Sequence, residues 1–180
     1  MADETYRIRD ATLEDRAALQ ALIARSARAL AVPAYTRQQV EAALRGAFGV
    51  DTQLIRDGTY FVAETAGELV ACGGWSRRRT LFGGDAHGER DAAQLDPRRD
   101  AARIRAFFVD PAHARKGLGR AILERCEARA RGAGFTRLEL MAMLSGVDFY
   151  LAHGYAPGAP ELHPLEAGLT IGFLPMTKRI

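Results

Sequence analysis

The residues best suited to chemistry lie between positions 107 and 123, where an apolar strand end leads through a turn into a helix. The strand end is Phe107-Phe108-Val109, and two glycines, Gly117 and Gly119, stand at the start of the helix. Glycines let the backbone curl so that successive N–H groups point into one concavity, and the unpaired N–H groups of a helix start favour an anion there. Cations accompany the glycines at Arg115, Lys116 and Arg120. The segment therefore predicts a phosphate-binding turn.

Other phosphate-binding loops also place glycines before a helix, but their spacing differs. A Walker loop needs Lys and then Ser or Thr directly after its last glycine, whereas Arg120-Ala121 follows Gly119 here. A dinucleotide fingerprint needs a third glycine and a downstream acidic residue. A purely structural alternative, in which Gly117 and Gly119 only permit tight packing at the helix start, stays open.

Two motifs resemble those of the GNAT superfamily of acyl-CoA N-acyltransferases. Val109-x-Pro111 followed by Gly117-x-Gly119 is similar to the family's strand end and its Arg/Gln-x-x-Gly-x-Gly/Ala turn. Ala114 stands where the first Arg or Gln is commonest, and Arg115 is displaced from that position by one residue. Downstream, Asp148-Phe149-Tyr150-Leu151-Ala152-His153-Gly154-Tyr155 is similar to the family's Phe-Tyr-x-x-x-Gly-Phe/Tyr segment. The resemblance covers the order of elements from about residue 5 to 155.

The resemblance implies an α/β (α+β) fold of one domain, residues 1–180, with a mixed, twisted central sheet of six to seven strands and about four flanking helices. Strands 4 and 5 of such a sheet are splayed apart. It further implies that acetyl-CoA is the cosubstrate, without a metal, and that its pantetheine pairs with backbone between these strands. The implied cofactor-binding residues are Phe107, Phe108, Val109, Arg115, Lys116, Gly117, Leu118, Gly119, Arg120 and Ser145.

The resemblance also implies a reaction, the direct acetylation of a primary amine on a small molecule or peptide. Tyr150 is the implied general acid for the CoA thiolate, because a phenol with a pKa of roughly 10 suits that proton transfer. A backbone N–H near Phe108 or Val109 is the implied oxyanion donor. Two alternatives stay open: Tyr150 as a core aromatic, and the whole chain as a non-catalytic acyl-CoA sensor or partner-dependent module.

The base and the acceptor-binding residues are less defined by the sequence. The possible bases are Glu139, His113, His87, Asp85 and Glu89, and the sequence does not choose among them. The resemblance implies that the first helices and the loop between strands 3 and 4 select the acceptor. The candidate wall of the acceptor site is then Tyr35, residues 75–79 and residues 82–100, with Tyr35, Trp75 and Arg77 as the named candidates. The alternative interpretation of Trp75 is a residue of the hydrophobic core, and that of Arg77 is a solvated residue at a strand end.

Composition limits the classes of function. The 180 residues are 48% hydrophobic and 26% charged, which predicts one folded domain. The formal charge of +3 is spread along the chain, so no nucleic-acid partner is expected. No apolar run approaches the roughly 20 residues that span a bilayer, so we expect no membrane partner and a cytoplasmic location. A homodimer is possible in this family. The spacing of Cys72 and Cys126 favours buried thiols over metal ligands.

The surrounding pattern predicts the elements that must position these residues. We expect a helix over 14–31, a second one capped by Thr36, a hairpin over 59–76 with a bulge or close packing at Gly73 and Gly74, and a final strand over 169–178. Pro175 should limit that last strand to an edge or an end. Residues 82–100 lack periodicity and predict a long loop that is poorly ordered without substrate. The motifs themselves fall on a strand over 102–109, a helix over 118–131, a strand over 135–141 and a short helix over 147–153.

Overall fold

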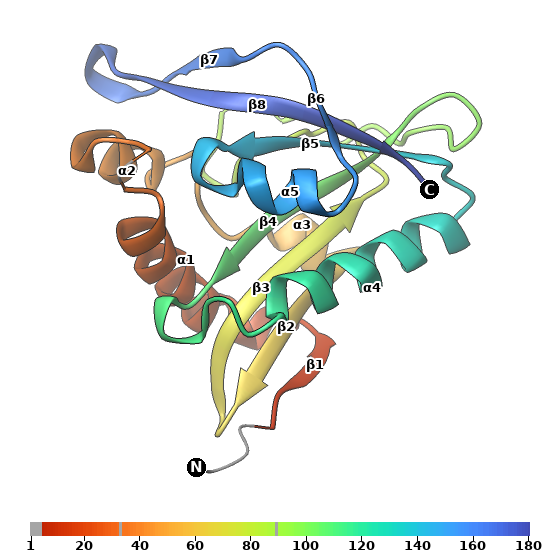
Figure 1. Ribbon diagram of the computed structural model, residues 1–180, viewed down its shortest axis with the longest axis horizontal. Helices are drawn as coiled ribbons and strands as arrows, with labels where there is room; N and C mark the ends of the chain where they lie inside the picture. The colour runs from red at the N-terminus through yellow and green to blue at the C-terminus, as the bar shows by residue number, and fades with distance from the viewer. Residues whose placement is uncertain (1–4, 33, 89) are drawn as a thin grey trace.

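The structure, a computed structural model, describes residues 5–32, 34–88 and 90–180. Its described strands form one mixed sheet of eight strands in the order β1-β2-β3-β4-β5-β8-β6, and β7 also pairs with β8 (Figure 1). The strands are β1 (Arg7–Asp10), β2 (Tyr60–Thr65), β3 (Glu68–Ser76), β4 (Ala102–Val109), β5 (Arg137–Met143), β6 (Ala156–Pro157), β7 (Glu161–Pro164) and β8 (Thr170–Arg179). The predicted α/β class with a central mixed sheet is confirmed.

The strand number differs from the prediction of six to seven because of β6 and β7. These strands have two and four residues, and most of their side chains are exposed. Such short segments show no alternation of apolar and polar residues, which is the sequence signal for a strand. They add to the outer side of β8, where backbone pairing alone defines them.

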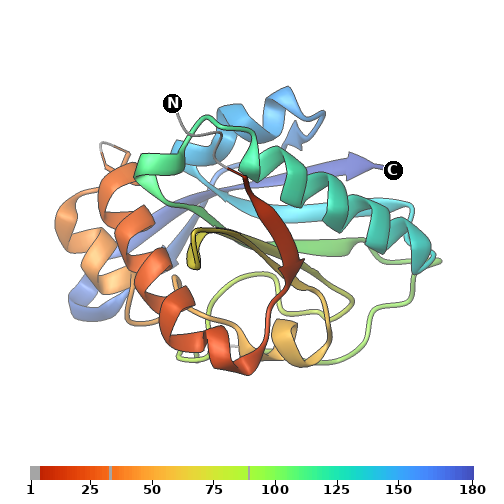
Figure 2. The ribbon, with the colours of Figure 1, turned by 90° about the horizontal axis from the view of Figure 1, so that it is seen from below.

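Two layers of helices enclose the sheet (Figures 1 and 2). The described helices are α1 (Arg16–Leu30), α2 (Arg37–Ala43), α3 (Thr52–Arg56), α4 (Leu118–Gly132) and α5 (Val147–Ala152). The prediction of about four missed α3, whose five residues are too few to show helical periodicity. On β2, Tyr60 and Val62 join the core beneath α1 and α2, while Phe61 and Ala63 join the core beneath α4 and α5. Successive side chains of a strand point to opposite faces, so one strand supplies both cores.

Strands β4 and β5 separate, as predicted, after a short parallel contact. Their register contains only Ala102 opposite Leu138 and Arg103 opposite Glu139, and beyond these pairs the strands diverge (Figure 1). Beyond these pairs β4 and β5 no longer pair with each other, although each keeps its other neighbour in the sheet. The facing edges of β4 and β5 therefore border an open space in the middle of the sheet.

A bulge in β4 changes the direction of the backbone at this opening. The register between β3 and β4 shifts between Cys72 and Gly74, and Ala106 has a positive φ of 56°. The Tyr60 hydroxyl and the Cys72 thiol both donate to the Ala106 carbonyl, at 3.3 and 3.6 Å. A Cβ at Gly73 would lie 2.7 Å from the Phe107 ring. The predicted bulge and close packing are therefore both present.

Residues 82–100 differ from the expected poorly ordered loop. The described part of this segment is hydrogen-bonded through its backbone to the residues just after β3. The amide of Thr80 donates to the Asp91 carbonyl at 2.8 Å, and the amide of Leu95 donates to the Arg77 carbonyl at 2.8 Å. Leu95 is buried in the core beneath α4. These backbone bonds connect residues more than ten apart, so no local sequence pattern indicates them.

Pro175 lies in the middle of β8, which corrects the prediction of an edge or end position. It pairs with Met141 of β5, and its carbonyl accepts a hydrogen bond from the Gly158 amide at 2.7 Å. The nitrogen and oxygen of one strand residue face the same neighbour. The proline nitrogen therefore faces the gap between β6 and β7. The absence of an N–H group there removes no hydrogen bond between paired strands. None of the described helices combines the length and apolar character needed to cross a membrane.

Candidate active site

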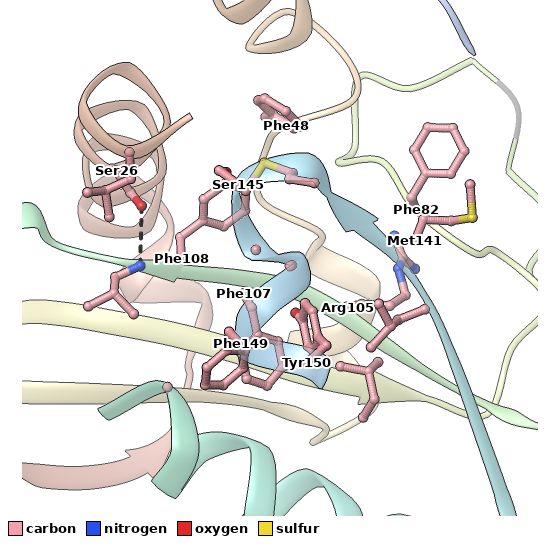
Figure 3. A pocket seen from close by; sticks show the side chains of 18 of the residues that line it. Ser26, Phe48, Phe82, Arg105, Phe107, Phe108, Met141, Ser145, Phe149 and Tyr150 are labelled. Atoms are coloured by element: carbon pink, nitrogen blue, oxygen red, sulfur yellow. Dashed lines mark hydrogen bonds between the residues drawn. The ribbon is translucent and has the colours of Figure 1, made fainter. Parts of the chain in front are cut away.

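The opening between β4 and β5 leads into a cavity of about 440 Å³ (Figure 3). Its lining comes from β4, the turn before α4 and the first turn of α4, the end of β5, α5, α1, β8, the segment after α2 and the loop after β3. The predicted residues that it brings together are Phe107, Phe108, Val109, Arg115, Gly117, Leu118, Gly119, Arg120, Ser145 and Tyr150. Lys116 lies in the same turn but does not line the cavity. Residues far apart in sequence thus share one concave surface, as a ligand site requires.

The glycine turn has the backbone shape expected of an anion cradle. Arg115 and Gly117 both have left-handed backbones, with φ of 65° and 81°. Residues in this conformation next to a helix start direct successive N–H groups into one concavity. No described atom lies within 4 Å of a Cβ built at Gly117, whereas one at Gly119 would lie 3.3 Å from Phe149. The backbone angle, and not tight packing, therefore calls for glycine at position 117.

Arg120, one of the cations around this turn, has only an exposed partner. Arg120 donates to Glu124 at 2.8 Å, and both side chains are more than half exposed. An exposed pair of this kind contributes little to stability. Arg120 can therefore leave Glu124 for an anion in the turn at small cost.

Tyr150 lies on α5, where its ring packs among aromatic side chains beside the cavity. The centroid distances from its ring to Phe149, Tyr155 and Phe107 are 5.1, 5.6 and 6.4 Å. None of the described residues hydrogen-bonds its hydroxyl group, and burial raises the pKa of the phenol above its ordinary value. The side chain is therefore a packed aromatic on the cavity wall whose hydroxyl group keeps its proton at neutral pH (Figure 3).

The amides proposed as oxyanion donors already have partners in the protein. The Val109 N–H donates to the Ser26 hydroxyl of α1 at 3.2 Å, and Ser26 itself is buried (Figure 3). The Phe108 amide is directed at Cys72 across the ladder between β3 and β4. In the described structure α1 and β3 thus supply acceptors for these two amides, which the local sequence does not reveal.

The carboxylates considered as bases are engaged elsewhere. Glu139 forms an ion pair with Arg103 of the neighbouring strand. Asp85 accepts hydrogen bonds from the amide and hydroxyl of Thr52, at 2.9 and 3.1 Å. Neither side chain lines the cavity.

The histidines considered as bases divide into two groups. His113 lines the cavity, and its Nδ1 lies 3.1 Å from the Tyr6 hydroxyl. The ring of His87 packs on Phe82 with a centroid distance of 4.8 Å and does not line the cavity. Glu89 lies outside the described residues. His113 is thus the one candidate of this set that the described structure brings to the cavity.

Tyr35 has a structural position, which corrects its place in the predicted acceptor wall. Its hydroxyl donates to the Gly172 carbonyl at 2.7 Å and accepts from the Leu144 amide at 2.8 Å. The side chain therefore joins the segment before α2 to β8 and to the end of β5, and it does not line the cavity.

Trp75 and Arg77 also lie away from the cavity. Trp75 is 4% exposed and packs edge-on against Phe135, with a centroid distance of 6.2 Å. Arg77 lies over the Trp75 ring at 6.0 Å and donates to the Asp57 carbonyl at 3.4 Å. The face of β3 that carries Trp75 is covered by the core beneath α4, so the acceptor-wall prediction for both residues is corrected.

The position of Trp75 predicts a stability effect without a direct effect on an acceptor. Trp75→Ala should lower the free energy of unfolding by about 3–5 kcal/mol, because the lost indole leaves a cavity in the core. Trp75→Phe keeps a ring against Phe135 and should leave the KM for an amine unchanged. Urea unfolding and steady-state kinetics measure the two effects. If Trp75→Phe had wild-type stability but a raised KM for the amine, Trp75 would contact the acceptor after all.

The inner end of the cavity contains residues that sequence reasoning missed. Its lining there includes Phe48, Phe82, Arg105, Met141 and Phe173. Arg105 is the one signal that the sequence carries, as a cation inside the apolar run of β4. The others are apolar residues on four separate segments, which only the tertiary fold brings together.

Both cysteines are buried free thiols, as predicted. Burial raises the pKa of Cys72 to about 12 and that of Cys126 well above its ordinary value. At neutral pH neither provides a thiolate, which is the nucleophilic form.

Comparisons with known proteins agree with this fold and site. The model of the acetyltransferase (GNAT) family matches residues 18–155. A GCN5-related N-acetyltransferase (aminotransferase, class-II) structure from Rhodopseudomonas palustris is 18% identical, with a TM-score of 0.73 over 100% of this chain and 99% of the other. The structure of PaiA N-acetyltransferase from Thermoplasma acidophilum, solved with coenzyme A, is 13% identical, with a TM-score of 0.64 over 98% and 99%.

A ribosomal-protein-alanine N-acetyltransferase structure from Brucella melitensis is 18% identical, with a TM-score of 0.63 over 97% of this chain and 99% of the other. No curated protein matches the chain significantly in sequence. At these identities the solved structures establish the fold alone. The family model spans most of the chain, and the chain therefore belongs to the GNAT family of acetyltransferases.

Proposed function

We propose that this protein transfers an acetyl group from acetyl-CoA to a primary amine of a small molecule or peptide. The observation that carries the proposal is a single cavity that joins the glycine cradle to the Tyr150 side chain. One end can bind a phosphorylated cosubstrate and the middle holds a proton donor. Family membership supports the same reaction class.

The residues present fit acetyl-CoA. Left-handed Arg115 and Gly117, followed by the start of α4, suit a pyrophosphate group. The separated edge of β4 suits a linear arm that pairs with backbone, and apolar Phe107 and Val109 suit its methylene groups. If the Val109 amide exchanged its hydrogen bond to Ser26 for one to this arm, it would provide one such backbone donor.

The chain's own contribution to the reaction is proton transfer and the exclusion of water. When bound, acetyl-CoA supplies an acetyl thioester for attack by the neutral amine and leaves as the thiol. Tyr150 holds a proton at its hydroxyl oxygen and donates it to the departing sulfur. Its aromatic neighbours keep the phenol desolvated and therefore protonated. Of the bases that the sequence offered, His113 is the one on the cavity wall, and it would receive the amine proton directly or through water.

Thiol release in the presence of acetyl-CoA and a panel of amines tests this function. We expect free thiol to appear only with both substrates, and CoA alone to raise the melting temperature. Stabilisation by CoA without turnover of any amine would favour the non-catalytic sensor instead. Absence of stabilisation by both CoA and acetyl-CoA would refute the cofactor assignment.

The protonated state of Tyr150 predicts a particular pH profile. A general acid acts in its protonated form, and burial raises the pKa of this phenol, so it keeps its proton as pH rises. Turnover should therefore increase as the acceptor amine loses its proton and then remain level to about pH 10. The kcat of the wild type, measured from neutral to alkaline pH at constant ionic strength, checks this. A wild-type decline below about pH 9 that Tyr150→Phe abolishes would contradict a raised pKa.

A further inference from the structure

A buried arginine stands at the inner end of the cavity, away from the glycine cradle. The side chain of Arg105, on β4, is 3% exposed and lines the cavity. Figure 3 shows its guanidinium beside Phe82 and Met141. The lining also includes the apolar residues Phe48, Met143 and Phe173. A full charge in such surroundings is costly unless it is paired and hydrogen-bonded.

The charges of the described residues around Arg105 do not balance. Asp51 lies 2.7 Å from Arg105 through Oδ2 and 2.7 Å from Arg90 through Oδ1, and its side chain is 1% exposed. Among the described residues, two guanidinium groups thus share one carboxylate, which leaves one positive charge in excess. Asp85, on the same loop as Arg90, instead faces Thr52 and lies 3.8 Å from an exposed arginine, Arg16.

The hydrogen bonds of Arg105 are also incomplete. One terminal nitrogen pairs with Asp51, and the other donates to the Gly83 carbonyl at 2.6 Å. Its Nε is buried, and none of the described residues accepts a hydrogen bond from it. Burial lowers the pKa of Arg105, with Asp51 opposing this effect and Arg90 adding to it. Within the described residues, Arg105 and Arg90 thus share one carboxylate, and the Arg105 Nε has no acceptor, while Oδ2 of Asp51 pairs with Arg105 by charge without a hydrogen bond.

We propose that the acceptor amine also carries a carboxylate, bound at Arg105, next to an apolar body that contacts the aromatic wall. This inference rests on the function proposed above and names its substrate class, of which a hydrophobic amino acid is the simplest member. A carboxylate supplies the missing charge and the missing acceptor together. The same wall includes Phe82 and Phe173, whose ring centroids are 5.3 Å apart, and it suits an apolar side chain.

The size of the cavity supports a small acceptor. Its volume of about 440 Å³ must hold both the acetyl-bearing arm and the acceptor. In the reaction the amine nitrogen bonds to the acetyl carbon as the carbon–sulfur bond breaks. The nitrogen loses one proton and the thiol gains one, so no further reactant is needed.

Matched acceptor pairs test the carboxylate in the wild-type protein. Phenylalanine and leucine are compared with phenylalaninamide and leucinamide, which differ only in the charged group. We expect kcat/KM for each acid to exceed that for its amide by at least about tenfold. The amine of the amide is less basic and is therefore more often neutral, so a preference for the acid cannot arise from the nucleophile. Equal or better use of the amides would overturn the inference.

Two matched variants test Arg105 itself. Arg105→Gln and Arg90→Gln each remove one guanidinium from Asp51 and leave the other, but only Arg105 lines the cavity. We expect Arg105→Gln to abolish the preference for acids while CoA still raises its melting temperature. Arg90→Gln should keep the preference. Retention of the preference in Arg105→Gln would refute the role of Arg105.

A binding measurement separates this inference from the proposed function. With CoA present, phenylalanine should raise the melting temperature of the wild type further, whereas phenylalaninamide should not. If CoA stabilises the protein and both compounds have the same effect, the carboxylate inference fails alone. If CoA has no effect, the cofactor assignment fails first. Arg105→Gln should lose the extra stabilisation by phenylalanine and keep that by CoA.

Discussion

Tyr150→Phe should lower kcat by about 100-fold, because a positioned general acid contributes roughly 10²–10⁴ to such a proton transfer. The substitution removes one oxygen and keeps the ring that packs on Phe107, Phe149 and Tyr155. The Tyr150 hydroxyl has no hydrogen bond to the described protein, so its loss leaves no partner unsatisfied. Steady-state kinetics at saturating acetyl-CoA measure the fall, and melting curves with CoA should match those of the wild type.

Tyr155→Phe is the matched control. Tyr155 is also a buried tyrosine near α5, but its hydroxyl donates to Glu127 at 3.0 Å and it does not line the cavity. Its loss should cost about 1–2 kcal/mol of unfolding free energy, because one hydrogen bond to a buried carboxylate disappears, and kcat should stay near that of the wild type. Equal turnover in Tyr150→Phe and the wild type would remove Tyr150 from the mechanism.

Gly119→Asp should weaken CoA binding by at least about tenfold, which corresponds to roughly 1.4 kcal/mol. The new carboxylate would stand in the first turn of α4, in the cradle that should hold the CoA phosphates, and like charges repel there. The same position favours an acidic side chain through the helix dipole, so the fold should tolerate the change. Titration of CoA by calorimetry gives the affinity.

Gly119→Ala separates charge from size at this position. Its Cβ would lie 3.3 Å from Phe149, so that ring must shift by a few tenths of an ångström. We expect an intermediate loss of affinity. Gly132→Ala, at the far end of α4 with no described atom within 4 Å of its Cβ, should bind CoA like the wild type. Wild-type affinity in Gly119→Asp would show that the phosphates bind elsewhere.

The elements around the two motifs were predictable because their signals are local. Helical spacing and the capping residue Thr36 indicated α1 and α2, and the turn at residues 66–67 indicated the hairpin of β2 and β3. The short elements α3, β6 and β7 were missed because they have two to five residues and their identity depends on what they pair or pack against. The internal place of Pro175 depends in the same way on the gap beside β8.

The same distinction between local and long-range signals applies to the candidate site. By itself the sequence determined the glycine cradle and the short helix that carries Tyr150, because the backbone conformation at both places depends on neighbouring residues. The role of Tyr150 came from the family resemblance, and its place beside the cavity depends on tertiary packing. The tertiary structure decided which other side chains face the cavity, removing Trp75 and bringing in Arg105. Those positions depend on contacts between segments that are distant in sequence, where packing and charge pairing act and local patterns carry no information.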